Sequence, residues 1–500
     1  MNRTYIKTPA YISYENILEK DYILSSPQYT KLIMPNSNYK FVRDFLSRTL
    51  KRTDLGVEVG SHNYINESPY YFLRTKALQQ HSFLLDINSE TSIPMMPRVF
   101  LNQNLKEGDL LISKDSNIGE IVILDKDYPN FMLSSAIYKL PIQEYKYYLL
   151  AFVKHQFFRE QLDFMVPKGA TIRHAKALFL NCKIPLPNKK RKETIRYIEI
   201  LMQAIINKEK LIKEHHEQIL IEIEKELLSN QKNESFNYSF PGINEIEKME
   251  RLDTGLYNKN FKYWNQLVLN YKYGSKDLLS RGFTWARGTS LENNAIKTRI
   301  DSDSYIKGFY ELVLPTNISQ YGYVDKSYFI GTSTKLKIIS KGDIIFGGEG
   351  FGKGRTYVVI DDTANVATNY HGIRIINNNN DLTESIFIRC FLAFWRHKGM
   401  IDYIGVGGSG GHCAPSYFHL IETPLFPKDV IKNIIKHYHN TSISYEAITK
   451  GNLDNFLNLD NDYNKLSGIY ELAMSIKYLN NKMNEAIDNV INDNLVTIKF

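Results

Sequence analysis

The chain has very little cysteine, little tryptophan and no long apolar run. Of its 500 residues only three are cysteines, at positions 182, 390 and 413, and they form no Cys-x-x-Cys pair. An odd, scattered set argues against a disulfide framework and against a cysteine-based zinc site, and it is typical of a reducing cytosol. No window approaches 18 uncharged apolar residues, and the first residues lack a continuous apolar core. We therefore expect neither a transmembrane helix nor a signal peptide.

An excess of charge of one sign is also nearly absent. The 62 Lys and Arg residues face 54 Asp and Glu residues, which leaves a formal net charge of +8. So mild an excess permits a nucleic-acid partner without requiring one, because it makes a strong field only where it is clustered. The 43% of hydrophobic residues can form real cores, and the length suggests roughly two to four domains.

The two halves of the chain repeat each other. Three landmarks recur in the same order at offsets of 232, 234 and 239 residues: Asp21 and Asp253, the segments EGDLLIS (107–113) and KGDIIFG (341–347), and the proline motifs around Pro185 and Pro424. Each Gly-Asp segment is followed by a glycine-bearing turn and a second apolar run, at 120–124 and 356–360, which predicts a β-hairpin in each half. The repeated order predicts a tandem duplication.

A long helix is expected after each proline motif. Residues 188–231 contain neither Pro nor Gly, and their apolar residues follow coiled-coil spacing: Ile198, Met202, Ile205, Ile212, Ile219 and Ile223. Glu209 and His216 complete the heptads as polar breaks. The C-terminal stretch repeats the pattern with Leu466, Ile469, Ala473, Ile476, Met483, Ile487 and Val490. The two stretches have opposite charge bias, which favours two helices that pack against each other; two separate amphipathic helices are the alternative. A 40-residue helix would be about 60 Å long and would act as a spacer.

Catalytic motifs are almost missing. The best match to a phosphate-binding loop, residues 347–354, ends in Gly354 where a Ser or Thr should bind Mg²⁺, and a β-rich run follows where a helix is required. His215 and His216 are adjacent and so point in different directions on a helix, and His437 and His439 have no third ligand nearby. We interpret these histidines as solvated or coiled-coil residues, and the basic run 189–192 as a solvated surface or a phosphate contact.

Two loops just before the proline motifs carry small donors and basic groups. They are residues 167–174 (PKGATIRH) and 407–416 (GGSGGHCAPS), at equivalent places in the two halves. Such loops can approach a duplex closely and donate to phosphates or base edges. A plain surface loop is the alternative.

These features, in this order, resemble the specificity (S) subunit of Type I restriction-modification systems. The resemblance is carried by RLDTGLYN at 251–258, by the two Gly-Asp segments, by GATIRHAKALFLNCKIPLPN at 169–188 and by the helix that follows. It covers nearly the whole chain. The first half departs from it, because Glu19-Lys20-Asp21-Tyr22 stands where an Arg-Leu-Asp signature is expected.

The resemblance implies an α+β fold of two tandem mixed α/β target recognition domains, separated by long antiparallel coiled-coil-like helices in a pseudo-two-fold repeat. The implied divisions are 1–187 for the first recognition domain, 188–240 for the central helical spacer, 241–427 for the second recognition domain and 428–500 for the C-terminal helical region. Each recognition domain would read one half of a split, asymmetric DNA sequence.

The resemblance also implies partners and a non-catalytic role in bacterial or archaeal cytoplasm. The helices would dock two methylation subunits, and restriction subunits would join through them. The chain itself would bind no cofactor and no metal, since S-adenosylmethionine, ATP and Mg²⁺ belong to the partners. The assembled complex would be an adenine-N6 DNA methyltransferase and ATP-dependent endonuclease in host defence. The resemblance also leaves room for a DNA-mimic inhibitor as a further partner.

Basic and polar residues that such a protein would turn to DNA are spread over both halves. The predicted DNA-binding residues are Arg48, Lys51, Arg52, Arg74, Arg98, Lys114, Lys168, Arg173, His174, Arg281, Arg287, Lys353, Arg355, Ser409 and His412. The predicted subunit-docking residues are Ile198, Met202, Ile205, Ile212, Ile219, Ile223, Ile469, Ile476, Met483 and Ile487.

Three other functions stay open at this point. A nuclease or methyltransferase would need a carboxylate cluster or a cofactor loop, and neither is visible in the sequence. A protein-protein scaffold built on the helices would leave two large loop-bearing domains without a role. A recognition subunit of a methylation-only or related defence complex cannot be distinguished from the full system by sequence.

Overall fold

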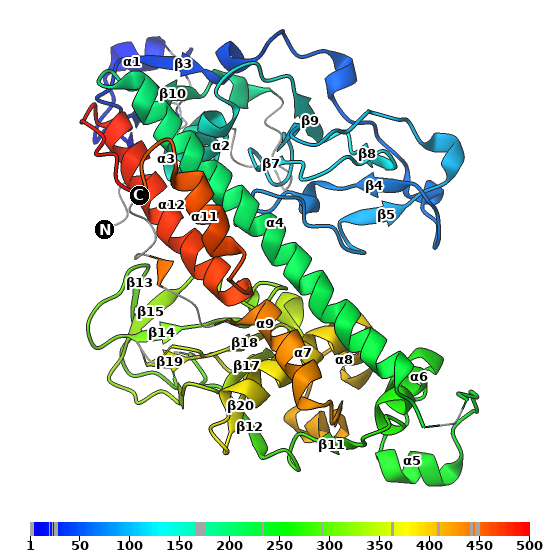
Figure 1. Cartoon of the computed structure of the whole chain (residues 1–500). Coiled ribbons are helices and arrows are strands. Elements are labelled where there is room, and N and C mark those ends of the chain that lie inside the picture. The colour runs from blue at the N-terminus through cyan, green and yellow to red at the C-terminus, as the bar shows by residue number, and fades with distance from the viewer. Residues whose placement is uncertain are drawn as a thin grey trace. The chain divides into compact units, whose positions relative to one another are not determined.

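The chain folds into two compact units, each of which mixes helices and sheets (Figure 1). The computed structural model describes residues 5–19, 21–22, 24, 29–165, 177–232, 235–292, 294–361, 365–407, 411–440, 444–445 and 451–500. Unit 1 comprises residues 1–210, 443–463 and 474–500, and unit 2 comprises residues 211–442 and 464–473. The predicted α+β class is confirmed. The predicted domain boundaries stay a prediction. The two units also include parts of the predicted helical spacers.

The described residues of unit 1 form four small sheets. The strands pair as β1–β2, β3–β10, β5–β4–β8 and β7–β6–β9. Their bounds are β1 Ile6–Lys7, β2 Lys31–Leu32, β3 Tyr39–Phe41, β4 Tyr71–Leu73, β5 Ser92–Pro94, β6 Leu110–Ser113, β7 Ile121–Ile123, β8 Phe131–Leu133, β9 Ile137–Leu140 and β10 Lys183–Pro185.

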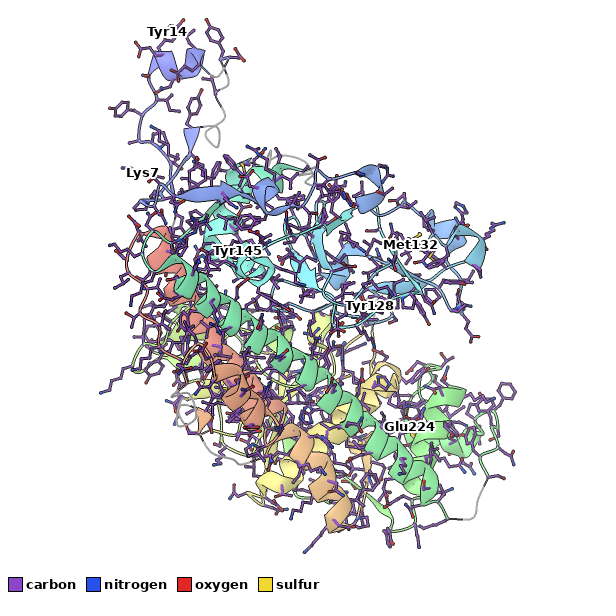
Figure 2. All side chains as sticks on the ribbon, turned by 45° about the horizontal axis from the view of Figure 1, so that its top comes forward. Lys7, Tyr14, Tyr128, Met132, Tyr145 and Glu224 are labelled. Atoms are coloured by element: carbon purple, nitrogen blue, oxygen red, sulfur yellow. The ribbon has the colours of Figure 1, made fainter. Side chains whose placement is uncertain are left out.

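The helices of unit 1 cover one face of the β7–β6–β9 sheet. Leu110 and Ile112 on β6 contribute to a core shared with these helices, whereas Leu111 faces a second core with β4 and β8. This alternation explains why the strand reads as a continuous apolar run, since both of its faces are buried. These helices are α2 Lys146–Lys154, α3 Gln156–Met165, the first part of α4 Arg191–Ser229, α11 Phe456–Asn464 and the second part of α12 Ile469–Ile491. Helix α1 Tyr14–Leu18 has no buried residue and stands away from this sheet (Figure 2).

In the part of unit 2 that the structure describes there are three sheets, with the strand orders β11–β21, β12–β20–β17–β18 and β13–β15–β14–β19–β16. The strand bounds are β11 Ser275–Asp277, β12 Phe283–Arg287, β13 Ile300–Ser302, β14 Tyr310–Leu312, β15 Tyr328–Gly331, β16 Ile338–Ile339, β17 Ile344–Gly347, β18 Thr356–Val358, β19 Val366–Ala367, β20 Gly372–Asn377 and β21 Glu422–Pro424. The helices of this unit, besides parts of α4 and α12, are α5 Ile243–Met249, α6 Lys259–Leu269, α7 Leu382–His397, α8 Met400–Ile404 and α9 Lys428–Tyr438.

The two units share a common core arrangement of strands and helices, which confirms the tandem repeat. In unit 1 the order β7–β6–β9 is followed by α2, and in unit 2 the order β18–β17–β20 is followed by α7. A parallel pair recurs as β4–β8 and β14–β19. The strand of each proline motif, β10 or β21, closes its unit by pairing antiparallel with an early strand, β3 or β11. Equivalent elements at equivalent chain positions are the outcome expected of a duplicated unit.

The Gly-Asp segments form the same turn in both units. Gly108 and Gly342 have φ values of +82° and +87°, which favour glycine. The carboxylates of Asp109 and Asp343 accept the backbone N–H three residues earlier, at 2.8 and 2.9 Å. Each turn leads into the predicted hairpin, β6–β7 or β17–β18. The recurring dipeptide is therefore explained by backbone conformation and by a side chain that closes the turn.

The predicted central helix is confirmed, whereas the predicted C-terminal helix consists of several shorter helices. Helix α4 runs without interruption from Arg191 to Ser229, about 58 Å at 1.5 Å per residue. In unit 1 its start lies beside the end of α12, because the Asn188 amide donates to the Asp493 carboxylate at 2.9 Å. The two helices are therefore antiparallel there and share one core (Figure 1). The stretch 428–500 holds α9, α11 and α12, and Leu466, which we had expected on the helix face, lies exposed in the turn before α12.

Candidate nucleic-acid interface

In unit 1 three predicted DNA-binding residues lie together in the loop that follows β3. The Arg48 guanidinium donates two hydrogen bonds to the buried carboxylate of Asp54 in the same loop, at 2.6 and 2.7 Å. These hydrogen bonds are the largest cause of a lowered pKa at Asp54, and burial opposes them. Arg52 donates to the Gly56 carbonyl at 3.1 Å, whereas the side chain of Lys51 is exposed. The loop thus uses Arg48 to hold its shape and turns Lys51 to solvent.

The other predicted residues of unit 1 are dispersed. Arg74 and Arg98 are exposed on separate one-turn segments near β4 and β5. Lys114 follows β6 and forms an ion pair with Asp115. The three remaining predicted residues lie outside the described part of the chain: Lys168, Arg173 and His174.

In unit 2 predicted residues gather around the glycine-rich hairpin of β17 and β18. The Glu349 carboxylate lies 3.0 Å from Arg287 and 3.0 Å from His371. Burial alone would raise the pKa of Glu349, but the hydrogen bonds from His371 and Arg287 lower it. The Arg287 guanidinium also stacks over Tyr370, 4.5 Å from the ring centroid. The backbone of His412 forms isolated bridges to Glu349 and Val406.

This surface combines cations with exposed aromatic rings. Lys353 on the hairpin is 2.7 Å from Asp402, and the rings of Phe351 and Tyr370 are exposed. Arginine beside an exposed aromatic ring is the combination that stacks on bases and neutralises phosphates. We call Arg287, Glu349, Phe351, Tyr370 and His371 the hairpin surface. Ser409, from the adjoining loop, lies outside the described residues.

Two predicted DNA-binding arginines are internal to unit 2. Arg281 has a side chain only 6% exposed, which forms an ion pair with Glu384 on α7. Arg355 is buried, donates to the Ile318 carbonyl at 2.7 Å and stacks on Phe351. Both hold elements of the unit together.

Close chain packing accounts for the glycines of the apparent phosphate-binding loop. A Cβ atom on Gly347 would lie 1.9 Å from the Gly352 carbonyl oxygen, and one on Gly352 would lie 2.4 Å from the carbonyl oxygen of Pro315. The strand β18 follows this turn, as the sequence predicts, where a phosphate-binding loop would lead into a helix.

A polar groove in unit 1 escaped the sequence reasoning. It encloses about 450 Å³ between the β6–β7 turn and α3, and its polar lining includes Gln79, Gln80, Ser116, Asn117, Arg159 and Asp163. Glutamine and asparagine read adenine by paired hydrogen bonds in the major groove. The adjacent glutamines were the available signal, but only the fold brings Asn117 and Arg159 beside them. Nearby, burial lowers the pKa of Lys154 to about 8, while Glu120 opposes the shift.

The predicted docking residues are buried in their own units. Of the ten, only Ile476 is partly accessible. In unit 1 the residues Ile198, Met202, Ile205, Met483 and Ile487 belong to one core. Their seam therefore holds helices of this chain together, and docking through these helices, which stays a prediction, would use other faces. Glu209, a predicted polar break, accepts the Phe83 N–H at 2.9 Å within unit 1.

The two histidines of α4, His215 and His216, are half-buried. His215 Nδ1 lies 2.8 Å from His437 Nδ1 on α9, and His437 Nε2 lies 3.2 Å from the Glu222 carboxylate. Burial is the largest cause that lowers the pKa of His215 to about 4. Among the described residues no group of three or more His, Cys, Asp or Glu side chains could hold a metal ion. In the same part of the chain no helix is long and apolar enough to cross a membrane.

Comparisons with known proteins gave matches among solved structures only. No family model matches the chain, and no curated protein matches it. The S subunit of a Type-I restriction-modification system from M. genitalium is similar at 13% identity, with 91% of this chain and 95% of that chain covered and a TM-score of 0.36. A structure described as the complex assembly and conformational transition of the type I R-M system is similar at 12% identity, covering 92% and 99%, with a TM-score of 0.27. The HsdS subunit from Thermoanaerobacter tengcongensis is similar at 11% identity, covering 87% and 95%, with a TM-score of 0.26.

Proposed function

We propose that this chain is the DNA-recognition subunit of a Type I restriction-modification complex. Each unit reads one half of a split, asymmetric target, and the helices α4 and α12 dock two methylation subunits. The observation that carries the proposal has two parts. The strand arrangement of unit 1 recurs in unit 2, and one unbroken 39-residue helix contributes residues to both units. Two copies of a reading unit suit a target of two unlike half-sites, since each copy can diverge in its loops while its scaffold is kept.

The surfaces for DNA differ between the units, as two different half-sites require. In unit 2 the hairpin surface offers Arg287 with Tyr370 for stacking and phosphate contact. In unit 1 the groove offers Gln79 and Gln80 for base edges, and Lys51 lies exposed for the backbone. Phosphate contacts position a protein on the duplex and base contacts specify the sequence. We assign Lys51 to positioning and the glutamines to specificity.

Partner subunits supply the chemistry in this proposal. S-adenosylmethionine belongs to the methylation subunits, ATP and Mg²⁺ to the restriction subunits, and the present chain supplies sequence choice. Docking falls to exposed residues of the helices, among which Ile221 and Leu228 on α4 are large and apolar. Large apolar side chains on a solvent face are typical of interfaces when they cluster, and these two are seven residues apart on one helix face.

A recognition subunit of a methylation-only or related defence complex is the closest alternative, since it would need the same two reading units. Co-purification separates the two, because only the full system retains an ATP-dependent restriction subunit. A scaffold without DNA readout is the weaker alternative. It would bind split and continuous DNA equally.

Exchange of one reading unit tests the proposal directly. Residues 250–420 are replaced by the corresponding segment of another family member, and the complex with a methylation subunit is assayed for its methylated sequence. The expected result is one altered half-site and one unchanged half-site. A change in both half-sites, or in neither, would contradict independent reading by the two units.

A further inference from the structure

A small cavity in unit 2 has cationic and hydrogen-bonding walls. It encloses about 60 Å³ between α4, α7 and the β17–β18 hairpin, and its polar lining consists of His216, Gln320, Arg355, Thr356, Arg396 and His397. None of the described residues that line it is acidic. A cavity of this size holds roughly four groups the size of water, at about 10–15 Å³ each.

Arg389 adds a fully buried charge on the same face of α7. It lies four residues before Ala393 and seven before Arg396, both of which line the cavity, so the three share one helix face. All three guanidinium nitrogens are buried without a hydrogen-bond acceptor among the described residues. Its neighbours interact weakly: the Tyr438 ring at 4.5 Å, the Cys390 thiol and the backbone at Gly322.

An arginine cannot escape this environment by losing its proton. A buried lysine neutralises itself when it lacks a partner, but the guanidinium stays charged at any ordinary pH. An uncompensated buried charge is strongly unfavourable, and ring contacts compensate only part of it. The site therefore calls for a negative group.

Two polar side chains that line the cavity each have an unpaired atom. Thr356 Oγ1 and His216 Nδ1 are buried without a hydrogen bond in the described part of the chain. His216 is the second polar break in the heptads of α4, where an apolar residue would have packed. Burial, with Arg389, His397 and Arg396 as further causes, lowers its pKa to about 3. A neutral imidazole beside cations can donate to an anion without adding to the charge.

We propose that this cavity binds one small tetrahedral oxyanion of the phosphate or sulfate class. Such an ion accepts several hydrogen bonds at once, for which Thr356 and His216 in the lining supply unpaired donors, and it neutralises the charges of Arg396 and the nearby Arg389 on α7. Bound there, it ties α4 to α7 within unit 2 and stabilises that unit. The inference is independent of the proposed DNA reading, because it concerns the interior of one unit.

Calorimetry and thermal unfolding of the full chain with inorganic phosphate test the site. Ionic strength is held constant with chloride. We expect one saturable site, and a Tm that rises with the logarithm of phosphate concentration above the dissociation constant. Sulfate is expected to compete with phosphate. If adenosine monophosphate also competes, the site accepts a terminal phosphate ester; if it does not, the site is specific for the free ion.

Variants separate a built site from a general salt effect. R396Q should weaken phosphate binding at least tenfold, T356V should weaken it severalfold, and R389M should abolish it. R299Q, which alters an exposed arginine of the same unit, is the matched control and should bind as the wild type does. If R389M does not fold, R396Q and T356V still decide the matter. No saturable heat in the wild type, or equal binding by R396Q and R299Q, would overturn the proposal.

Discussion

The Lys208 ammonium group lies 2.8 Å from the Asp460 carboxylate, and both side chains are completely buried in unit 1. The pair joins α4 to α11, and the hydroxyl of Tyr445 donates to the same carboxylate at 2.6 Å. The rings of Tyr445 and Tyr463 face the ammonium group at 4.7 and 5.1 Å. Burial lowers the pKa of Lys208, and Asp460 opposes this. The long helix thus carries a satisfied ion pair where its apolar seam would otherwise continue.

Removal of one partner of the Lys208–Asp460 ion pair should destabilise the protein strongly. Lys208→Met is expected to lower the free energy of unfolding by about 3–5 kcal/mol, because it leaves a buried carboxylate without its counter-charge. The matched control is Lys210→Met, whose half-exposed ion pair with Glu107 should contribute only about 0–1 kcal/mol. Urea unfolding measures both. The double variant K208M/D460L should recover most of the loss, and equal effects of K208M and K210M would refute the role of the pair.

His155 should make unit 1 sensitive to acid. Its ring is buried, Nδ1 accepts the Phe157 N–H at 3.2 Å, and burial lowers its pKa to about 4 against the opposing charge of Asp488. The unfolded chain, with a histidine pKa near 6.5, therefore binds the proton more tightly, and stability falls as pH drops from about 6.5 to 4.

The slope that His155 contributes should be at most about 1.4 kcal/mol per pH unit. Unfolding midpoints between pH 7 and 4 measure it. His155→Gln should flatten the dependence, whereas His62→Gln, an exposed residue of the same unit, should not. An unchanged pH profile in H155Q would contradict the assignment.

The Gly-Asp turns should be structural in both units. Asp343 accepts the N–H groups of Ser340 and Asn377 at 2.9 and 3.0 Å, and Asp343→Ala leaves them without an acceptor. We expect a loss of about 1–3 kcal/mol for D343A, and a smaller one for D109A, whose carboxylate is more exposed. The surface variant D301A is the control, and chemical unfolding is the measurement. A D343A variant as stable as D301A would show that the turn closes without its carboxylate.

Lys51 and Gln80 should have different effects on DNA binding. Lys51→Gln should weaken binding to all sequences alike and lower the slope of log affinity against log salt by about one. Gln80→Ala should relax the preference at one position of one half-site, at a cost of about 1–3 kcal/mol for the preferred base. Binding titrations of the assembled complex at several salt concentrations measure both. A change of sequence preference in K51Q would reverse the assignment.

Much of the fold could be predicted because it depends on local patterns. The heptad spacing and the missing Pro and Gly residues predict α4 to within three residues at its start, and the repeated Gly-Asp segments predict the hairpins. The C-terminal helix could not be predicted as one piece. Gly468 sits where a Cβ atom would lie 2.6 Å from the backbone of Tyr438, so the break before α12 depends on a tertiary contact.

The sites were less accessible to sequence reasoning for a physical reason. A basic residue in the sequence is equally compatible with solvent, with DNA or with an internal ion pair, and burial decides among them. Arg281 and Arg355 are internal in the structure. Arg389 is fully buried, and nothing in the sequence around it predicts that burial. The buried seam of α4 was identified correctly as apolar, but its contacts lie within the chain.

The most direct test of the central claim is methylome sequencing of a host that expresses this chain with its methylation subunit. The account predicts methylated adenines in one split motif, two specific half-sites separated by a fixed number of unspecified bases. Deletion of seven residues within 198–223 should change that number or abolish assembly. A continuous methylated motif, or no motif that depends on this chain, would contradict the account.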